Sequence, residues 1–193
     1  WLLLFTGMSA SLISTGLTFH QISVMASRGL DAGVAASVFV AIGPCSLAGA
    51  LTAGILVDRF PNRFVLAAVQ VLLFISMLWV FIITSHLHAL IYGAMLGFTG
   101  GLGMTAMTVV WANYYGRKHL GSIRGVGTAS MVASAALGPL PFGYIFDATA
   151  SYELAILIFL IMPAACFVAA ILAFPPKIDA RYARTTGGPL SGK

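Results

Sequence analysis

The amino-acid sequence predicts an all-α membrane protein with six transmembrane helices. Of its 193 residues, 60% are hydrophobic and only 8% are charged, whereas an ordinary soluble domain has about 25% charged residues. A helix needs about 20 mostly apolar residues to cross the hydrocarbon core of a bilayer. The sequence contains six such stretches with short polar breaks between them, so lipid rather than water is the expected surroundings.

The first three stretches cover residues 2–24, 32–57 and 64–84. The first two are rich in Gly, Ser and Thr, and the second carries Pro44 near its middle. The third has no glycine and consists largely of bulky apolar residues. Small residues let helix backbones approach closely within a membrane. We therefore expect the first two helices to lie in the protein interior and the third to face lipid.

The last three stretches repeat this order over residues 89–114, 122–145 and 152–174. The fourth contains five glycines, Gly138 and Pro139 interrupt the fifth, and the sixth again lacks glycine. A three-helix unit that occurs twice predicts two inverted repeats, as in many transporters. Because helices kink at proline and glycine, Pro44, Gly138 and Pro139 are predicted hinges.

The distribution of basic residues predicts the orientation. Nine of the ten Lys and Arg residues lie in alternate breaks and in the basic tail of residues 175–193. The positive-inside rule places that side in the cytoplasm, so both chain ends are expected there, in a plasma membrane or a bacterial inner membrane. Nucleic-acid binding needs basic residues gathered on a water-exposed surface, and it is not expected here. The start at Trp1, without an initiator Met, indicates a fragment.

A loop motif carries a family resemblance. Gly54, Asp58, Arg59 and Arg63 follow the second stretch with the spacing G-x3-D-R-x3-R, which resembles the cytoplasmic loop signature of the major facilitator superfamily. Residues 114–125 and 136–147 are similar to bacterial carriers of the monocarboxylate and oxalate/formate type. The resemblance implies the C-terminal six-helix half of a major facilitator fold, with a missing N-terminal six-helix half as its partner. It also implies that the loop motif latches the cytoplasmic side closed.

The same resemblance implies a secondary transporter of a small organic solute, working by alternating access as a symporter or an antiporter. Monocarboxylates are one candidate class, with protons as the coupling ion. Anion carriers of that group often place an Arg or Lys inside the second and fifth helices of this half, and this sequence has none near the middle of either helix. The neutralising charge for a carboxylate would then come from the missing half or from a proton taken up with it.

Polar side chains inside the stretches are the candidates for a substrate cavity. They are Ser14, Thr18, His20, Gln21, Thr105, Ser130 and Ser134. Three of them recur at three- and four-residue steps in the first stretch, which places them on one helix face. His20 adds an imidazole that can relay a proton. The competing interpretations are hydroxyl bonds to the helix backbone and an interfacial position for the histidine.

Two other functions remain open. One is a self-contained six-span protein that dimerises to form a pore or small carrier, which a gene continuing upstream of Trp1 would exclude. The other is a membrane-embedded enzyme that uses His20. The stretches contain no paired carboxylates, phosphate-binding loop or nucleophile beside a base, so neither an enzyme nor a cofactor is expected. His86 and His88 are too few ligands for a usual metal site.

Overall fold

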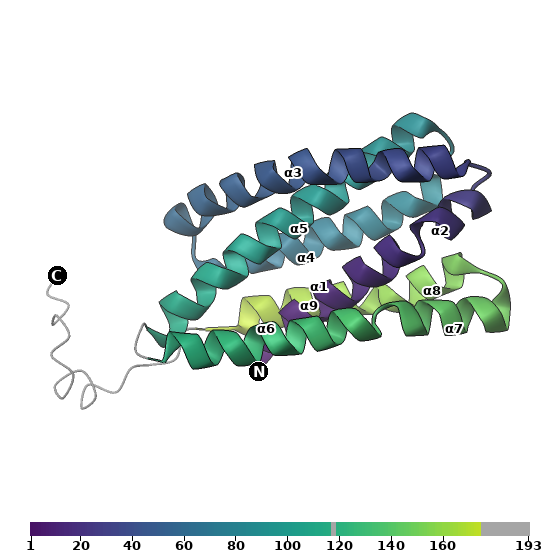
Figure 1. The fold of residues 1–193 in the computed structure, drawn as a ribbon. Helices are drawn as coiled ribbons and strands as arrows, with labels where there is room; N and C mark the ends of the chain where they lie inside the picture. Colours follow the sequence, from purple (N-terminus) through teal and green to yellow (C-terminus); the bar gives the residue numbers. More distant parts are fainter. Residues whose placement is uncertain (117–118, 175–193) are drawn as a thin grey trace, which may run out of the picture.

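The computed structural model describes residues 1–116 and 119–174, and within them every regular element is a helix (Figure 1). In chain order these are α1 (Leu2–Phe19), α2 (Gln21–Ser27), α3 (Ala32–Arg59), α4 (Asn62–Trp79), the 3-10 helix η1 (Val80–Ile82), α5 (His86–Tyr115), α6 (Leu120–Leu137), α7 (Pro139–Thr149), α8 (Tyr152–Phe159) and α9 (Ile161–Leu172). The predicted tail of residues 175–193 lies outside the described residues.

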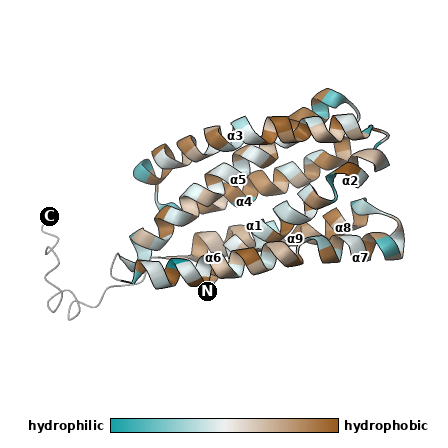
Figure 2. Cartoon of the chain, viewed as in Figure 1, coloured by the Kyte–Doolittle hydropathy of each residue, from teal (hydrophilic) through white to brown (hydrophobic). Residues whose placement is uncertain are grey.

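Most of these elements form six rods, where a rod is one helix or two consecutive helices on a common axis. Each rod is long and apolar enough to cross a membrane, which confirms the predicted fold class. They cover Leu2–Phe19, Ala32–Arg59, Asn62–Ile82, His86–Tyr115, Leu120–Thr149 and Tyr152–Leu172. In Figure 2 the hydrophobic colour runs along the rods, and hydrophilic residues gather near their ends. This is the pattern that a hydrocarbon slab bounded by water imposes, since polar groups are costly inside it.

Two of the rods are interrupted near a proline, and a third break separates the first rod from α2. Pro139 opens α7 and cannot donate to the carbonyl of Ala135, while Pro163, in the first turn of α9, cannot donate to that of Phe159. The third break lies at His20, between α1 and α2. By contrast, α3 continues through Pro44 as one helix.

Side chains cap the helices that start at one end of the molecule. Asp31 accepts a hydrogen bond from the Val34 N–H at 2.9 Å, and Ser85 accepts one from the His88 N–H at 3.3 Å. Ser151 similarly caps α8. These caps satisfy otherwise unpaired backbone donors. The opposite end holds the Arg59 to Arg63 turn and the end of α5 (Figure 1), and it is called the basic end below.

The closest packing joins α3 to α5. Added Cβ atoms at Gly93, Gly97 and Gly101 would meet the backbone of Val38, Ile42 and Ser46, respectively. Both series advance in steps of four, so the two helices run parallel and touch once per turn. The glycines allow this approach because a side chain would occupy the space of the neighbouring carbonyl.

The same pattern occurs between α1 and the α6–α7 rod. Ser134 donates to the Met8 carbonyl at 2.7 Å, Gly138 lies against the Leu12 carbonyl, and Phe142 lies against Gly16. This series also advances by four residues on both helices. The second rod of each three-rod unit therefore packs in parallel on the first rod of the other unit, which is the two-fold relation expected of inverted repeats.

The third rod of each unit also follows this two-fold relation. The burial of the second and fifth rods differs from what the sequence predicts. The rod containing α4 packs against α9 and α5, and α9 packs against α4 and α1. We expected the second and fifth stretches to lie inside, but only 17% of an apolar 18-residue segment is buried within this chain in α3 and in the α6–α7 rod, against 50% of such a segment in the α4–η1 rod. Small residues allow close approach on one face only, and the other face of each helix is open.

Candidate functional site

Two exposed surfaces of the bundle differ in chemistry. On the α4–η1 rod the exposed stripe consists of bulky apolar residues, which are Phe64, Val71, Ile75, Leu78 and Ile82. The α8–α9 rod has a matching stripe, which contains Leu154, Leu157, Ile161, Val168 and Leu172. Such stripes are typical of helices in contact with acyl chains.

The second surface is called the open face and comprises the exposed sides of α1, α3, α5, α6 and α7. On α6 it presents small and polar residues together with the exposed Val126 and Val132; the small and polar ones include Gly125, Thr128, Ala129, Ala133 and Ala136. On α5 it presents Gly100, Met104 and Thr108, at intervals of four residues. Because α5 contacts α3 on one flank and α1 and α6 on another, these residues lie between the two edge rods.

The polar residues predicted on the first stretch divide into two groups. Ser14 and Thr18 are partly exposed on α1, and Gly7, on the same face, lies between Met107 of α5 and Met131 of α6. This face therefore looks into the space between α5 and α6. Gln21 is buried on α2.

The amide of Gln21 is committed to another helix, since its Nε2 donates to the Ala35 carbonyl of α3 at 2.7 Å. Its Oε1 is buried and has no hydrogen-bond partner within the described residues. A buried amide that joins two helices favours a packing role.

His20 lies at the break between α1 and α2 and bridges two other elements. Its Nε2 is 3.0 Å from the carbonyl oxygen of Pro139, the first residue of α7, and its Nδ1 is 3.2 Å from the hydroxyl of Tyr152, the first residue of α8. A neutral imidazole protonated on Nε2 satisfies both contacts, because Nε2–H donates to the carbonyl while Nδ1 accepts from the Tyr152 hydroxyl. The ring also stacks on Phe142, with centroids 6.4 Å apart.

The candidates on the second three-rod unit are placed differently from one another. Ser134 is buried against α1, where its hydroxyl donates to the Met8 carbonyl. Ser130 and Thr105 are partly exposed on α6 and α5. Of the predicted hinges, Gly138 and Pro139 lie at the α6–α7 break, and Pro44 is exposed within the unbroken α3.

The four residues of the loop motif are spread over the basic end. Gly54 has open space where a side chain would lie, and Asp58 and Arg59 are exposed at the end of α3. Arg63 lies against the aromatic rings of Phe64 and Phe174. Across the described ranges the one ion pair is Arg28 with Glu153, so Asp58 does not pair with either arginine of the motif there.

The Arg28 contact is a feature that sequence reasoning missed. Its Nη2 lies 3.0 Å from Glu153 Oε1, and its Nη1 donates to the Phe81 carbonyl at 3.2 Å. These bonds join α2, η1 and α8 at the end opposite the basic end. The available signal was that Arg28 is the lone cation on that side of the chain.

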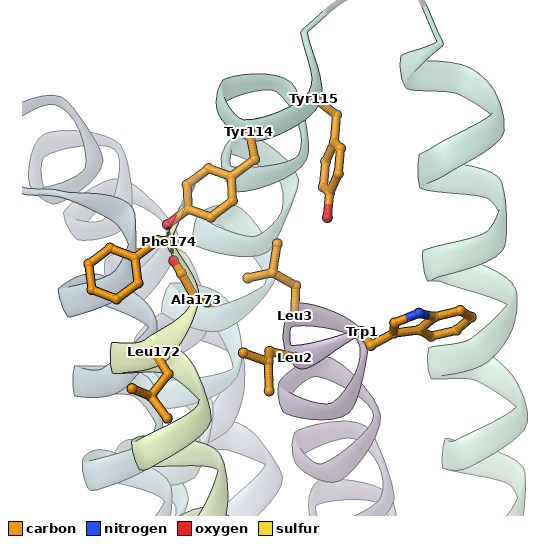
Figure 3. Close-up of a pocket in the computed structure, with 8 residues that line it drawn as sticks. All are labelled: Trp1, Leu2, Leu3, Tyr114, Tyr115, Leu172, Ala173 and Phe174. Carbon is orange, nitrogen blue, oxygen red and sulfur yellow. Dashed lines mark hydrogen bonds between the residues drawn. The ribbon is translucent and has the colours of Figure 1, made fainter. Parts of the chain in front are cut away.

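At the basic end a pocket of about 140 Å³ lies between the start of α1 and the ends of α5 and α9 (Figure 3). The Tyr114 hydroxyl donates to the Ala173 carbonyl at 2.8 Å in its wall. In the part of the chain that the structure describes, no group of three potential metal ligands comes together.

A family model described as Major Facilitator Superfamily matches residues 2–189, which is nearly the whole chain. No curated protein matches the sequence.

Proposed function

Because the chain belongs to the major facilitator superfamily, we propose that it is one six-helix half of a secondary transporter that moves a small organic solute by alternating access. The observation that carries this proposal is the contrast between the two exposed surfaces. Bulky apolar stripes cover the third rod of each unit, whereas on α5 and α6 the open face mixes small and polar residues with the apolar Met104, Val126 and Val132. A second six-helix half on the open face would bury α3 and the α6–α7 rod.

In this proposal the solute binds between the halves, near the middle of the membrane. Ser14, Thr18, Thr105 and Ser130 are partly exposed and supply the cavity side chains. Gln21 and Ser134, which are buried and bonded to neighbouring helices, hold the cavity walls in register.

The proposed solute class is organic acids, monocarboxylates among them. No Lys or Arg lies near the middle of any described rod, and an uncompensated carboxylate is costly at that depth. Either the partner half supplies the cation, or a proton enters with the solute, in which case His20 is the candidate relay. The basic end faces the cytoplasm in this arrangement, as the positive-inside rule requires.

Cysteine accessibility scanning of the full-length protein tests the cavity. Single cysteines at Ser14, Thr18, Thr105 and Ser130 should react with an aqueous thiol reagent, and added solute should protect them. Cysteines at Val71 and Ile75, on the apolar stripe of α4, are the matched controls and should not react. Complete protection of the first set in every state, with or without solute, would remove the cavity assignment.

A further inference from the structure

A second depression at the basic end has the chemistry of an anion site. It measures about 560 Å³ and lies between the α3–α4 turn, the end of α5 and Phe174. Its polar lining comes from Asn62, Arg63, Asn113 and Tyr114, and its described lining contains no carboxylate. A ligand in this depression therefore meets a cation and neutral donors.

The Arg63 side chain is held in place at this depression. Its guanidinium carbon lies 4.8 Å from the ring centroid of Phe64 and 4.5 Å from that of Phe174, which are favourable cation–π distances. Within the described residues the guanidinium has no carboxylate partner. Its N–H donors lie in a fixed plane and match two oxygens of a phosphate group.

Asn62 adds a second, independent observation. It is 7% exposed and lines the depression as the first residue of α4, and within the described ranges its side-chain amide makes no hydrogen bond. Pro61 precedes it and provides no side-chain cap, so the first N–H groups of the 18-residue helix also lack one. The Asn62 amide is not among the fully enclosed polar groups that lack a partner, so it is open to the depression and can donate to an oxygen-bearing ligand.

The position of the depression relative to the bilayer indicates the source of such a ligand. The α4–η1 rod has 21 residues, which at 1.5 Å per residue span about 32 Å, close to the hydrocarbon thickness of about 30 Å. Asn62 and Arg63 therefore lie at the level of lipid headgroups. Phe64 begins the exposed apolar stripe of α4 directly beside them, where acyl chains would pack.

We propose that this depression binds the phosphodiester group of an anionic phospholipid, with Arg63 and the Asn62 amide as its main donors. An anionic lipid is favoured over a zwitterionic one because the described lining offers no carboxylate for a choline or ethanolamine cation. The site does not depend on the transported solute, since it lies outside the open face.

Native mass spectrometry of the full-length protein tests the proposal with phosphatidylglycerol, phosphatidylcholine and inorganic phosphate as probes. Wild type should retain phosphatidylglycerol in preference to phosphatidylcholine, and Arg63→Ala should weaken phosphatidylglycerol binding about tenfold, the loss of one charge-assisted bidentate contact. Arg59→Ala is the matched control, because it removes the same charge from the same turn without touching the depression, and it should leave binding within about twofold.

The Arg63→Lys variant and a displacement experiment with inorganic phosphate complete the test. Arg63→Lys keeps the charge but loses the planar fork, so it should fall between wild type and Arg63→Ala, and it replaces that variant if the alanine protein does not fold. Equal losses for Arg59→Ala and Arg63→Ala, or no loss for either, would overturn the proposal. Displacement of bound lipid by millimolar inorganic phosphate would assign the site to free phosphate instead, while retention of lipid supports the headgroup.

Discussion

The contact between α3 and α5 gives the sharpest prediction, because one glycine lies inside it and another lies outside it on the same helix. A Cβ added at Gly97 would overlap the Ile42 carbonyl and lie 2.8 Å from the Ile42 Cα, whereas a Cβ added at Gly100 would meet nothing within 4 Å. To restore ordinary contact with the Ile42 carbonyl oxygen, α3 must move outward by about 1 Å, a gap that forfeits about half of the dispersion attraction along the contact.

The expected change in stability is the balance of two opposing effects, which are overpacking and helix propensity. Overpacking costs about 1–3 kcal/mol, and the better helix propensity of alanine offsets about 1 kcal/mol of it, so Gly97→Ala should lower the free energy of unfolding by up to about 2 kcal/mol. Gly100→Ala gains the propensity term alone and should leave stability unchanged or raise it by up to about 1 kcal/mol.

Detergent-solubilised full-length protein can be unfolded with increasing sodium dodecyl sulfate and followed by tryptophan fluorescence. The difference between the two alanine variants is the quantity of interest, since both change glycine to alanine on α5. The reasoning would be refuted if Gly97→Ala were as stable as Gly100→Ala, because a backbone in contact with α3 cannot accept a methyl group without movement.

Three further predictions concern polar contacts. Tyr152→Phe leaves the Nδ1 of His20 without its donor and should destabilise the protein by about 0.5–1.5 kcal/mol; no change in the same unfolding titration would show that the bridge is not formed. Arg28→Met loses the Phe81 carbonyl bond as well as the ion pair and should cost about 1–3 kcal/mol, while Glu153→Gln, at a carboxylate 58% exposed, should cost at most about 1 kcal/mol. High salt should remove the Glu153→Gln cost but only the ion-pair part of the Arg28→Met cost, so a Glu153→Gln cost that does not change with salt would contradict the assignment. Ser134→Ala should cost about 0.5–1.5 kcal/mol and leave solute affinity unchanged, and a change in affinity would instead place this hydroxyl in the cavity.

The number and placement of the rods could be predicted from the sequence because the bilayer imposes a simple rule. Each spanning helix must satisfy its own backbone and present about 20 apolar residues, so hydropathy alone located all six. The breaks at Pro139 and Pro163 also have a local cause, namely the missing N–H. The break at His20 has no such residue, and it depends on contacts with α7 and α8.

Contacts between distant residues could not be predicted in this way. The amide of Gln21 shares a helical face with Thr18, yet it is buried because α3 lies over it. Arg63 was predicted from its motif, but its contact with Phe174 joins residues 111 positions apart. Composition also identified the helices that can pack closely without showing which of their faces does so, and α3 and α6 were therefore expected to be more buried than they are.

The two parallel contacts explain why one of the matching rods is interrupted and the other is not. The contact of Ile42 with Gly97 corresponds under the two-fold relation to that of Gly138 with Leu12, which puts Pro44 level with the stretch between Pro139 and Pro141. In the first contact the glycines belong to α5, so α3 keeps its side chains and stays helical through its proline. In the second contact the glycine that touches the partner backbone belongs to the proline-bearing rod itself, and that rod breaks there. Because His20 bonds to the carbonyl of Pro139, a bend in the fifth rod would act directly on the break between α1 and α2. We therefore expect the fifth rod to bend more readily than the second, although both carry proline.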